Sequence, residues 1–260
     1  MSSKLGRLWE KLVIRLAQSI MNRRGYEGVP MVVLAGDYIS LKIMVQGRFE
    51  YQEISALEKH VFPSLDRNSH CLDIGANIGN HCVAFAPWFA TVQALEPNPI
   101  VFDVLSLNAK FAGNIMAHQV GASDQEFMAT AVLKPGNLGA TKITEDKSSE
   151  GKTIEFRCVR PDSYLPPEVV DNISFVKIDV EGHEYEVMHG CERILKASHP
   201  VVAFELLRKD FDQNGKRVVE LLRQHGYDHF YTSSGDGLER IHDFTKRNYK
   251  MILAATRPLP

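Results

Sequence analysis

Apolar and polar positions along the chain follow two periods, and their succession predicts an order of strands and helices. Short apolar runs bounded by turn residues predict buried strands over 70–75, 91–96, 115–121, 174–180 and 200–206. Helical spacing predicts intervening helices over 80–89, 99–112, 182–197 and 216–225. This alternation is typical of a doubly wound, Rossmann-like α/β sheet. Residues 228–232 and 249–256 complete the predicted seven-stranded sheet as a terminal antiparallel hairpin.

The N-terminal residues carry a different pattern. Residues 4–20 predict an amphipathic helix with an apolar face and a separate basic edge of Lys4, Arg7, Lys11 and Arg15. Such a helix packs on its own domain or on a second subunit, or it makes peripheral membrane contact through residues 4–24. Residues 31–34 and 39–45 predict short strands, and 51–62 predict a helix. We therefore expect an N-terminal α+β addition over 1–52 and a larger domain over 53–260.

The middle of the chain predicts an insertion in the sheet pattern. Residues 127–134 and 153–160 have the composition of an extra strand pair. The polar segment 136–151 lies between them, and a loop of this length is usually functional or disordered. We interpret this loop as a mobile lid over the substrate.

The most informative motif is the turn that follows the first predicted strand. Asp73 ends an apolar run, and Gly75 and Gly79 follow it with a Gly-x-x-x-Gly spacing. A dinucleotide site has a different glycine spacing and places a pyrophosphate on the following helix. Asp73 would repel a phosphate and attract a cation. The expected ligand is therefore nucleoside-like and positively charged, and S-adenosylmethionine, with its adenosine, sulfonium and ammonium, fits this description.

A second acid follows at the expected distance. Residues 91–96 predict the next strand, which ends in Glu96 before Pro97 and Asn98. In a doubly wound sheet, an acid at the end of the second strand accepts hydrogen bonds from ribose hydroxyls. Dehydrogenases share this feature, so Glu96 favours the cationic cofactor only in combination with Asp73.

Composition limits the remaining possibilities. The net charge of −2 gives no global attraction to nucleic acid, and no basic-aromatic patch stands out beyond the N-terminal helix. The four cysteines show no metal-binding spacing and lie in apolar runs, which predicts buried reduced thiols and a cytoplasmic protein. We therefore expect no nucleic-acid partner and no dedicated metal site.

The chain resembles the FkbM-type S-adenosylmethionine-dependent methyltransferases between about residues 50 and 255. The resemblance lies in five segments in the expected order, at 72–79, 94–99, 121–124, 176–184 and 201–205. It implies a class I methyltransferase sheet, S-adenosylmethionine as cofactor and methylation of hydroxyl oxygens on sugars or natural products. It also implies that Ser123 or Asp124 contacts the adenine.

The methyl-transfer centre is expected between the carboxyl ends of the first and fourth strands, where open α/β sheets bind ligands. Asp179 lies at the end of the fourth strand, and Glu181 and His183 follow it. A hydroxyl is a weak nucleophile and needs a general base, so His183 or Asp179 is the predicted base, with Glu181 orienting it. Glu205, at the end of the fifth strand, completes the predicted catalytic group and is expected to contact substrate.

Alternative interpretations stay open at this point. Asp179 and Glu205 could together hold Mg²⁺ with substrate oxygens, although the acid-plus-amide pair of catechol-type enzymes is absent after the fifth strand. The rival functions are a nicotinamide-dependent oxidoreductase and a non-catalytic cofactor- or partner-binding module. The acceptor is expected to be a glycan or a small molecule, and the oligomeric state is not predicted. The predicted cofactor site comprises Asp73, Gly75, Asn77, Gly79, Asn80, Glu96, Pro97, Asn98, Ser123 and Asp124.

Overall fold

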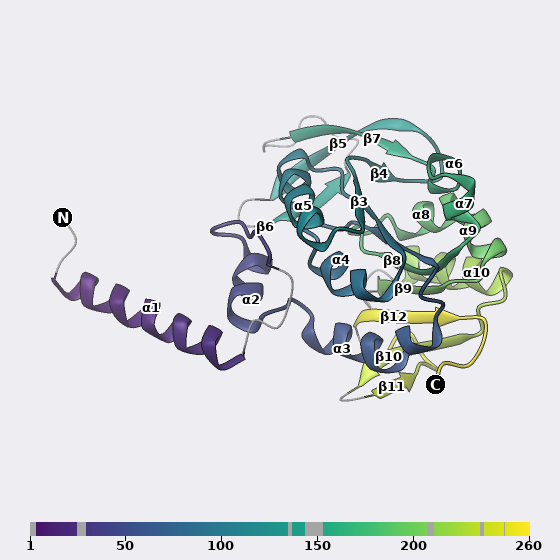
Figure 1. The fold of residues 1–260 in the computed structure, drawn as a ribbon. Coiled ribbons are helices and arrows are strands. Elements are labelled where there is room, and N and C mark those ends of the chain that lie inside the picture. Colours follow the sequence, from purple (N-terminus) through teal and green to yellow (C-terminus); the bar gives the residue numbers. More distant parts are fainter. Residues whose placement is uncertain are drawn as a thin grey trace.

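The computed structural model describes residues 4–24, 30–134, 137–143, 153–206, 211–234, 237–246 and 248–260. Its centre is a mixed sheet in the order β11-β10-β12-β9-β8-β1-β2-β3 (Figure 1). The bounds of these strands are β1 His70–Ile74, β2 Thr91–Leu95, β3 Ile115–His118, β8 Ile173–Ile178, β9 Val201–Leu206, β10 His229–Ser234, β11 Gly237–Arg240 and β12 Tyr249–Ala255.

The predicted doubly wound sheet is confirmed. Strands β3, β2, β1, β8 and β9 are parallel neighbours. The sheet thus starts in its middle with β1, grows to one side through β2 and β3, and then continues on the other side of β1 with β8 and β9. Strand β12 pairs antiparallel with both β9 and β10, as the predicted terminal hairpin requires. The predicted count of seven strands is wrong, because residues 237–240 add β11 at the edge of the sheet.

Helices cover both faces of this sheet. Two cores result: α3, α4 and α5 contribute apolar side chains to one, and α8, α9 and α10 to the other. The bounds are α3 Tyr51–His60, η1 Phe62–Ser64, α4 Asn80–Phe85, η2 Ala86–Trp88, α5 Pro99–Ala112, α6 Pro161–Tyr164, α7 Pro167–Val170, α8 Glu184–Gly190, α9 Glu192–Ala197, η4 Phe211–Gly215 and α10 Lys216–Gln224. The helix predicted over 182–197 is thus two helices.

A second sheet, in the order β4-β7-β5-β6, lies beside the carboxyl end of β3 (Figure 1). Its strands are β4 Gly121–Ala122, β5 Phe127–Lys134, β6 Asn137–Ile143 and β7 Thr153–Val159. The predicted pairing of 127–134 with 153–160 is confirmed. The third strand ends earlier than predicted, because 121–122 join this second sheet. Residues 137–143 form a strand instead of a loop, and 144–152 lie outside the described residues.

The N-terminal segment contains helices α1, Lys4–Arg24, and α2, Tyr38–Gln46. The strand predicted over 39–45 is wrong because Asp37 caps a helix there: its carboxylate accepts from the Ser40 N–H at 2.9 Å. Residues 31–34 do not form a strand either. The Asn108 side chain binds both backbone groups of Val32. The domain boundary at residue 52 stays a prediction.

Candidate active site

A cavity opens at the carboxyl ends of β1, β2 and β8, where an open α/β sheet binds its ligand. Six of the predicted site residues line it: Gly75, Glu96, Pro97, Asp179, Glu181 and His183. The rest of the wall is largely apolar and includes Val120, Gly121 and Ala122 from the β3–β4 region and Phe156 from β7. Sequence reasoning missed this apolar wall, because placing the extra strand pair beside the site requires the second sheet to be known.

Gly75 lies where two loops of the site come closest. Its φ of +79° is in the left-handed region. A Cβ on this residue would lie 1.9 Å from the Asp179 carbonyl oxygen, so no other residue fits without moving the β8–α8 loop. The sequence suggested that this glycine lets the backbone approach a ligand. The structure adds that it lets the carboxyl ends of β1 and β8 approach each other.

Glu96 is buried at the end of β2, and its carboxylate is held by the backbone. Its two oxygens accept hydrogen bonds from the N–H of Asn77 at 3.0 Å and of Asn98 at 2.8 Å. Burial raises the pKa of Glu96 to about 7, although these two hydrogen bonds oppose the shift. Each oxygen has a lone pair beyond the one that the backbone uses, so the carboxylate can also accept from a diol.

Asp73 does not line the cavity. It is fully buried, with Oδ1 at 3.7 Å from Nζ of Lys177 and Oδ2 accepting from the Cys82 thiol at 3.0 Å. The cation that contacts Asp73 in this structure is therefore Lys177, where the sequence suggested a positively charged ligand. A role of Asp73 toward the cofactor stays a prediction.

Lys177 was missed by the sequence reading, although a lysine inside an apolar strand is a signal. It stands opposite Asp73 in the β1–β8 register and also lies 3.3 Å from Asp179. Burial lowers the pKa of Lys177, but the carboxylates of Asp179, Asp73 and Glu50 outweigh it and raise the pKa above its usual value. The lysine is thus a permanent positive charge between two acids of the predicted site.

His183 lies at the start of α8 and links distant parts of the chain. Its Nε2 is 3.0 Å from the hydroxyl of buried Ser123, and its Nδ1 is 3.5 Å from Glu186. Burial lowers the pKa of His183, while Glu186 and Asp124 act in the opposite direction. The side chain is therefore predominantly neutral at pH 7 and can accept a proton.

The other predicted cofactor residues have structural partners. Asn80 binds both backbone groups of Phe49, and Asn77 adopts a left-handed conformation with its side chain on the N–H of Ile78. Gly79 also has positive φ and packs against Leu105. Asn98 caps α5. These residues shape the loops of the site, and their contact with a cofactor stays a prediction.

Glu205 lies outside the cavity wall at the end of β9. Burial raises its pKa to about 7, and the negative charges of Asp179, Glu181, Glu50 and Glu184 add to the shift. Among the described residues, no group of three or more His, Cys, Asp or Glu side chains has the geometry of a metal site.

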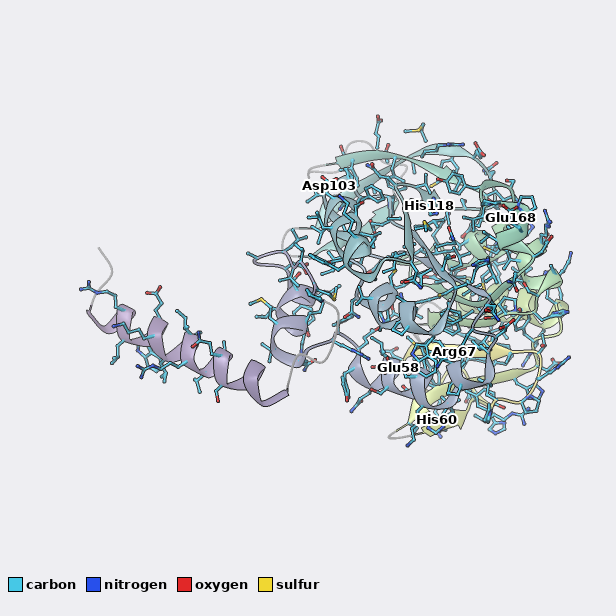
Figure 2. The ribbon with its side chains drawn as sticks, in the orientation of Figure 1. Glu58, His60, Arg67, Asp103, His118 and Glu168 are labelled. Atoms are coloured by element: carbon cyan, nitrogen blue, oxygen red, sulfur yellow. The ribbon has the colours of Figure 1, made fainter. Side chains whose placement is uncertain are left out.

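Replacement of Glu205 by glutamine tests the effect of burial and of the neighbouring negative charges on this carboxyl group. A pKa raised on folding makes a carboxyl group stabilising below its unfolded pKa of 4.5, and this stability is lost as the pH rises through about 7. Glu205→Gln should therefore raise the free energy of unfolding by about 1 kcal/mol at pH 8, after allowance for solvent screening, and leave it unchanged at pH 4. Urea titrations at both pH values measure the difference. The matched control is Glu168→Gln at the surface (Figure 2), which should change neither value.

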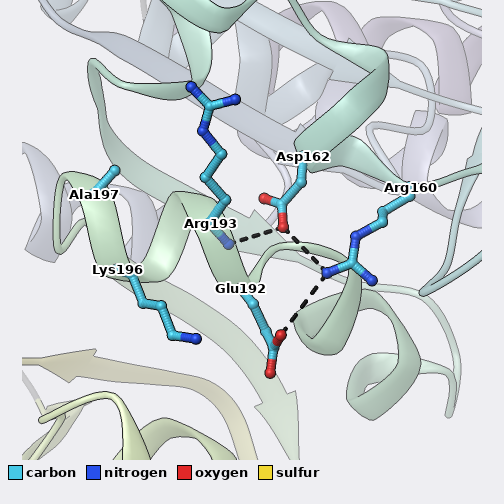
Figure 3. Close-up of a pocket in the computed structure, with 6 residues that line it drawn as sticks. All are labelled: Arg160, Asp162, Glu192, Arg193, Lys196 and Ala197. Atoms are coloured by element: carbon cyan, nitrogen blue, oxygen red, sulfur yellow. Dashed lines mark hydrogen bonds and ion pairs between the residues drawn. The ribbon is translucent and has the colours of Figure 1, made fainter.

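Charged side chains line a second hollow, at the start of α9 (Figure 3). Asp162 accepts hydrogen bonds from the backbone N–H groups of Arg193, at 2.8 Å, and Ile194, at 3.0 Å, and so caps α9 from outside. Arg160 donates to the carbonyl oxygens of Asp124 and His189 and pairs with Asp162. The hollow therefore joins the loop after β4 to the junction of α8 and α9.

The cysteine prediction is confirmed in part. All four cysteines, Cys71, Cys82, Cys158 and Cys191, are buried and free. Burial raises the pKa of each thiol, so none is an activated nucleophile. The cytoplasmic location inferred from these thiols stays a prediction.

The geometry described above agrees with the comparison to known families. The model of the methyltransferase FkbM domain matches residues 73–228, and the chain belongs to this family. The protein is therefore a methyltransferase with a Rossmann-like α/β fold.

Two curated relatives show what this chain is similar to. The hexuronic acid methyltransferase AglP of Haloferax volcanii is 30% identical over 222 residues, which cover 82% of this chain and 88% of the relative. The 31-O-demethyl-FK506 methyltransferase FkbM of Streptomyces tacrolimicus is 29% identical, over 60% of this chain and 71% of the relative.

A solved structure has the same fold. The methyltransferase FkbM from Methylobacillus flagellatus KT superimposes with a TM-score of 0.51 at 16% identity. The alignment covers 93% of this chain and 58% of that chain, so this chain spans little more than half of the solved protein.

Proposed function

We propose that this protein is an S-adenosylmethionine-dependent O-methyltransferase that acts on a hydroxyl group of a sugar, a glycan or a small natural product. The observation that carries the proposal is that one cavity is lined by two groups of residues. Gly75 and Glu96 follow β1 and β2, and Asp179, Glu181 and His183 follow β8. This arrangement places a carboxylate that can accept hydrogen bonds from a diol, and several candidate general bases, around the same cavity. Membership of a methyltransferase family argues against the nicotinamide-dependent alternative.

The residues of the cavity fit S-adenosylmethionine. The Glu96 carboxylate has free lone pairs for the two ribose hydroxyls, and the apolar wall beside it, with Leu95, Val120 and Phe156, suits the faces of an adenine ring. Glu181, on the same wall, supplies negative charge for the positively charged end of the cofactor. When bound, this cofactor supplies the methyl group.

We assign the general base to His183. Its low pKa keeps the imidazole neutral, whereas the charge of Asp179 is already paired with Lys177 at 3.3 Å. The acceptor hydroxyl would give its proton to the imidazole as its oxygen forms a bond to the methyl carbon and the bond from that carbon to sulfur breaks, which leaves S-adenosylhomocysteine. Ser123 and Glu186 contact the two ring nitrogens, and Glu181, on the same cavity wall, is proposed to help orient the base.

The proposed acceptor class is supported by the relatives. One relative is named for a hexuronic acid and the other for 31-O-demethyl-FK506. Both names describe oxygen-rich acceptors, and a hydroxyl is the group for which a neutral histidine base is useful. Glu205, at the end of β9, is the proposed contact to this acceptor.

The proposed function is tested first by cofactor binding and then by methyl transfer. Calorimetric titration with S-adenosylmethionine, S-adenosylhomocysteine and NAD⁺ should show binding of the first two ligands and none of the third. Transfer of labelled methyl to a panel of hexuronic acids, other sugars and hydroxylated small molecules then identifies the acceptor. Binding of NAD⁺ alone would overturn the proposal.

Glu96→Gln is expected to weaken S-adenosylmethionine binding by about tenfold or more at pH 8, because hydrogen bonds to a charged acceptor are stronger than those to an amide. The pKa of about 7 makes the wild-type affinity pH-dependent. Affinity should rise between pH 6 and pH 8 as the carboxyl group ionises, while the variant should show no such rise. Calorimetry at both pH values measures this. Equal pH profiles for the two proteins would contradict the assigned role of Glu96.

A further inference from the structure

Helix α1 extends away from the body of the protein and contacts α2 (Figure 1). Its apolar side chains are not covered by the rest of the chain. At 100° per residue, the described large apolar side chains other than Ile14 occupy an arc of roughly 140°. The exposed fractions within the arc are 65% for Leu8, 61% for Trp9, 46% for Leu12, 60% for Val13 and 54% for Leu16, and Ile14, outside the arc, is exposed by 49%.

The basic residues of α1 form a second stripe. Arg7, Lys11 and Arg15 follow each other at a spacing of four residues, so they lie along one side of the helix, next to the apolar arc. The helix has a net charge of +5, whereas the whole chain has −2, which leaves −7 for the remainder. An excess of positive charge thus lies on a helix that also exposes several large apolar side chains.

Helix α2 adds a second exposed apolar stripe. Tyr38, Leu41 and Met44 recur every three residues and are exposed by 54%, 57% and 45%. The opposite side of α2 is buried, with Ile43 in the small core that also contains residues of α5. Helix α2 is therefore anchored to the body while its outer side, like α1, presents apolar groups to the surroundings.

We propose that α1, together with the outer side of α2, binds the surface of a membrane rich in anionic lipids. A helix of this kind buries its apolar arc at the level of the headgroups, and its cations meet lipid phosphates at the edge of that arc. No described helix is long and apolar enough to cross a membrane, so the expected mode is peripheral binding.

A lipid surface explains both stripes better than the two other predicted partners. The body of this chain does not cover the arc, since the side chains named above remain about half exposed or more. A second copy would bring its own three cations to the interface, and a helix pair buries a narrower seam than this arc. A membrane offers a broad apolar phase and fixed negative charge along its border.

The test uses the full chain with Trp88→Phe, which leaves Trp9 as the only tryptophan. Vesicles of phosphatidylcholine that contain roughly 30% phosphatidylglycerol should bind the protein and shift the Trp9 fluorescence emission to shorter wavelength. Pure phosphatidylcholine should bind it far less. The charge reversal Arg7→Glu with Lys11→Glu should lower the partition coefficient roughly 25-fold or more, since each cation near such a surface contributes about fivefold.

The matched control reverses two exposed lysines elsewhere, Lys110→Glu with Lys196→Glu, and should leave most of the binding intact. Leu12→Asp should abolish the emission shift by disrupting the apolar arc. The proposal is overturned if anionic vesicles do not bind the folded protein, or if both charge reversals weaken binding equally. It is also overturned if sedimentation shows a dimer that Trp9→Asp dissociates, because the apolar face would then serve a second copy.

Discussion

Gly75→Ala should destabilise the protein by about 4 kcal/mol, which is at the upper end of single substitutions. The left-handed φ of +79° alone costs alanine about 1–2 kcal/mol. The larger share comes from the Cβ, which would lie 1.9 Å from a backbone oxygen of Asp179 and must push the β8–α8 loop away. Urea unfolding measures the stability, and S-adenosylmethionine titration should show loss of binding.

The matched control for this prediction is Gly36→Ala. Gly36 has nearly the same φ, +81°, but an added Cβ meets no atom within 4 Å. It should lose only about 1 kcal/mol, the cost of the backbone conformation. If both variants lost the same stability, the close approach of the two loops would not be the reason for a glycine at position 75.

His183→Asn should lower the rate of methyl transfer by about 10²–10⁴-fold, the usual contribution of a general base. Asparagine keeps a polar side chain near Ser123 but cannot accept the proton of the acceptor. The dissociation constant for S-adenosylmethionine should change little. Single-turnover transfer of labelled methyl measures the rate, and the acid limb of its pH profile should disappear in the variant.

Two further variants make this result specific. His189→Asn changes a more exposed histidine that pairs with Asp124 at 3.4 Å, and it should leave the rate within a few-fold of wild type. Asp179→Asn separates the two candidate bases. Loss of the pH dependence in this variant, with the His183 variant active, would assign the proton transfer to Asp179 instead.

Much of the fold could be predicted because local signals agree with it. Helix α5 runs over the predicted residues 99–112, since Asn98 caps its start and Gly113 ends it. Helices α8 and α9 were predicted as one, because the cap that starts α9 comes from Asp162, some thirty residues earlier in the chain. The 39–45 segment failed for another reason: a short apolar run does not distinguish a strand from a helix.

The candidate site was predictable in its position more than in its contacts. The ends of β1, β2 and β8 follow from the strand order, and they bring Gly75, Glu96 and Asp179 together. The partners of Asp73 and His183 depend on register and on contacts between distant segments. Lys177 faces Asp73 only because of the β1–β8 pairing, and Ser123 reaches His183 across the two sheets.

Two asparagines, Asn80 and Asn108, hold residues 30–50 in a way that bears on how this segment can vary between relatives. Asn80 and Asn108 bind the main-chain N–H and C=O groups of Phe49 and Val32, and no side chain of that segment takes part in these four bonds. These four bonds therefore do not depend on which amino acids the segment contains, whereas Ile43 holds it through the small core shared with α5. We therefore expect that side chains outside this core, including Glu50, whose charge acts on Glu205, can be exchanged by mutation while the backbone keeps its path. We therefore expect that exchanging the exposed positions of residues 30–50 between relatives changes acceptor preference while the fold is kept.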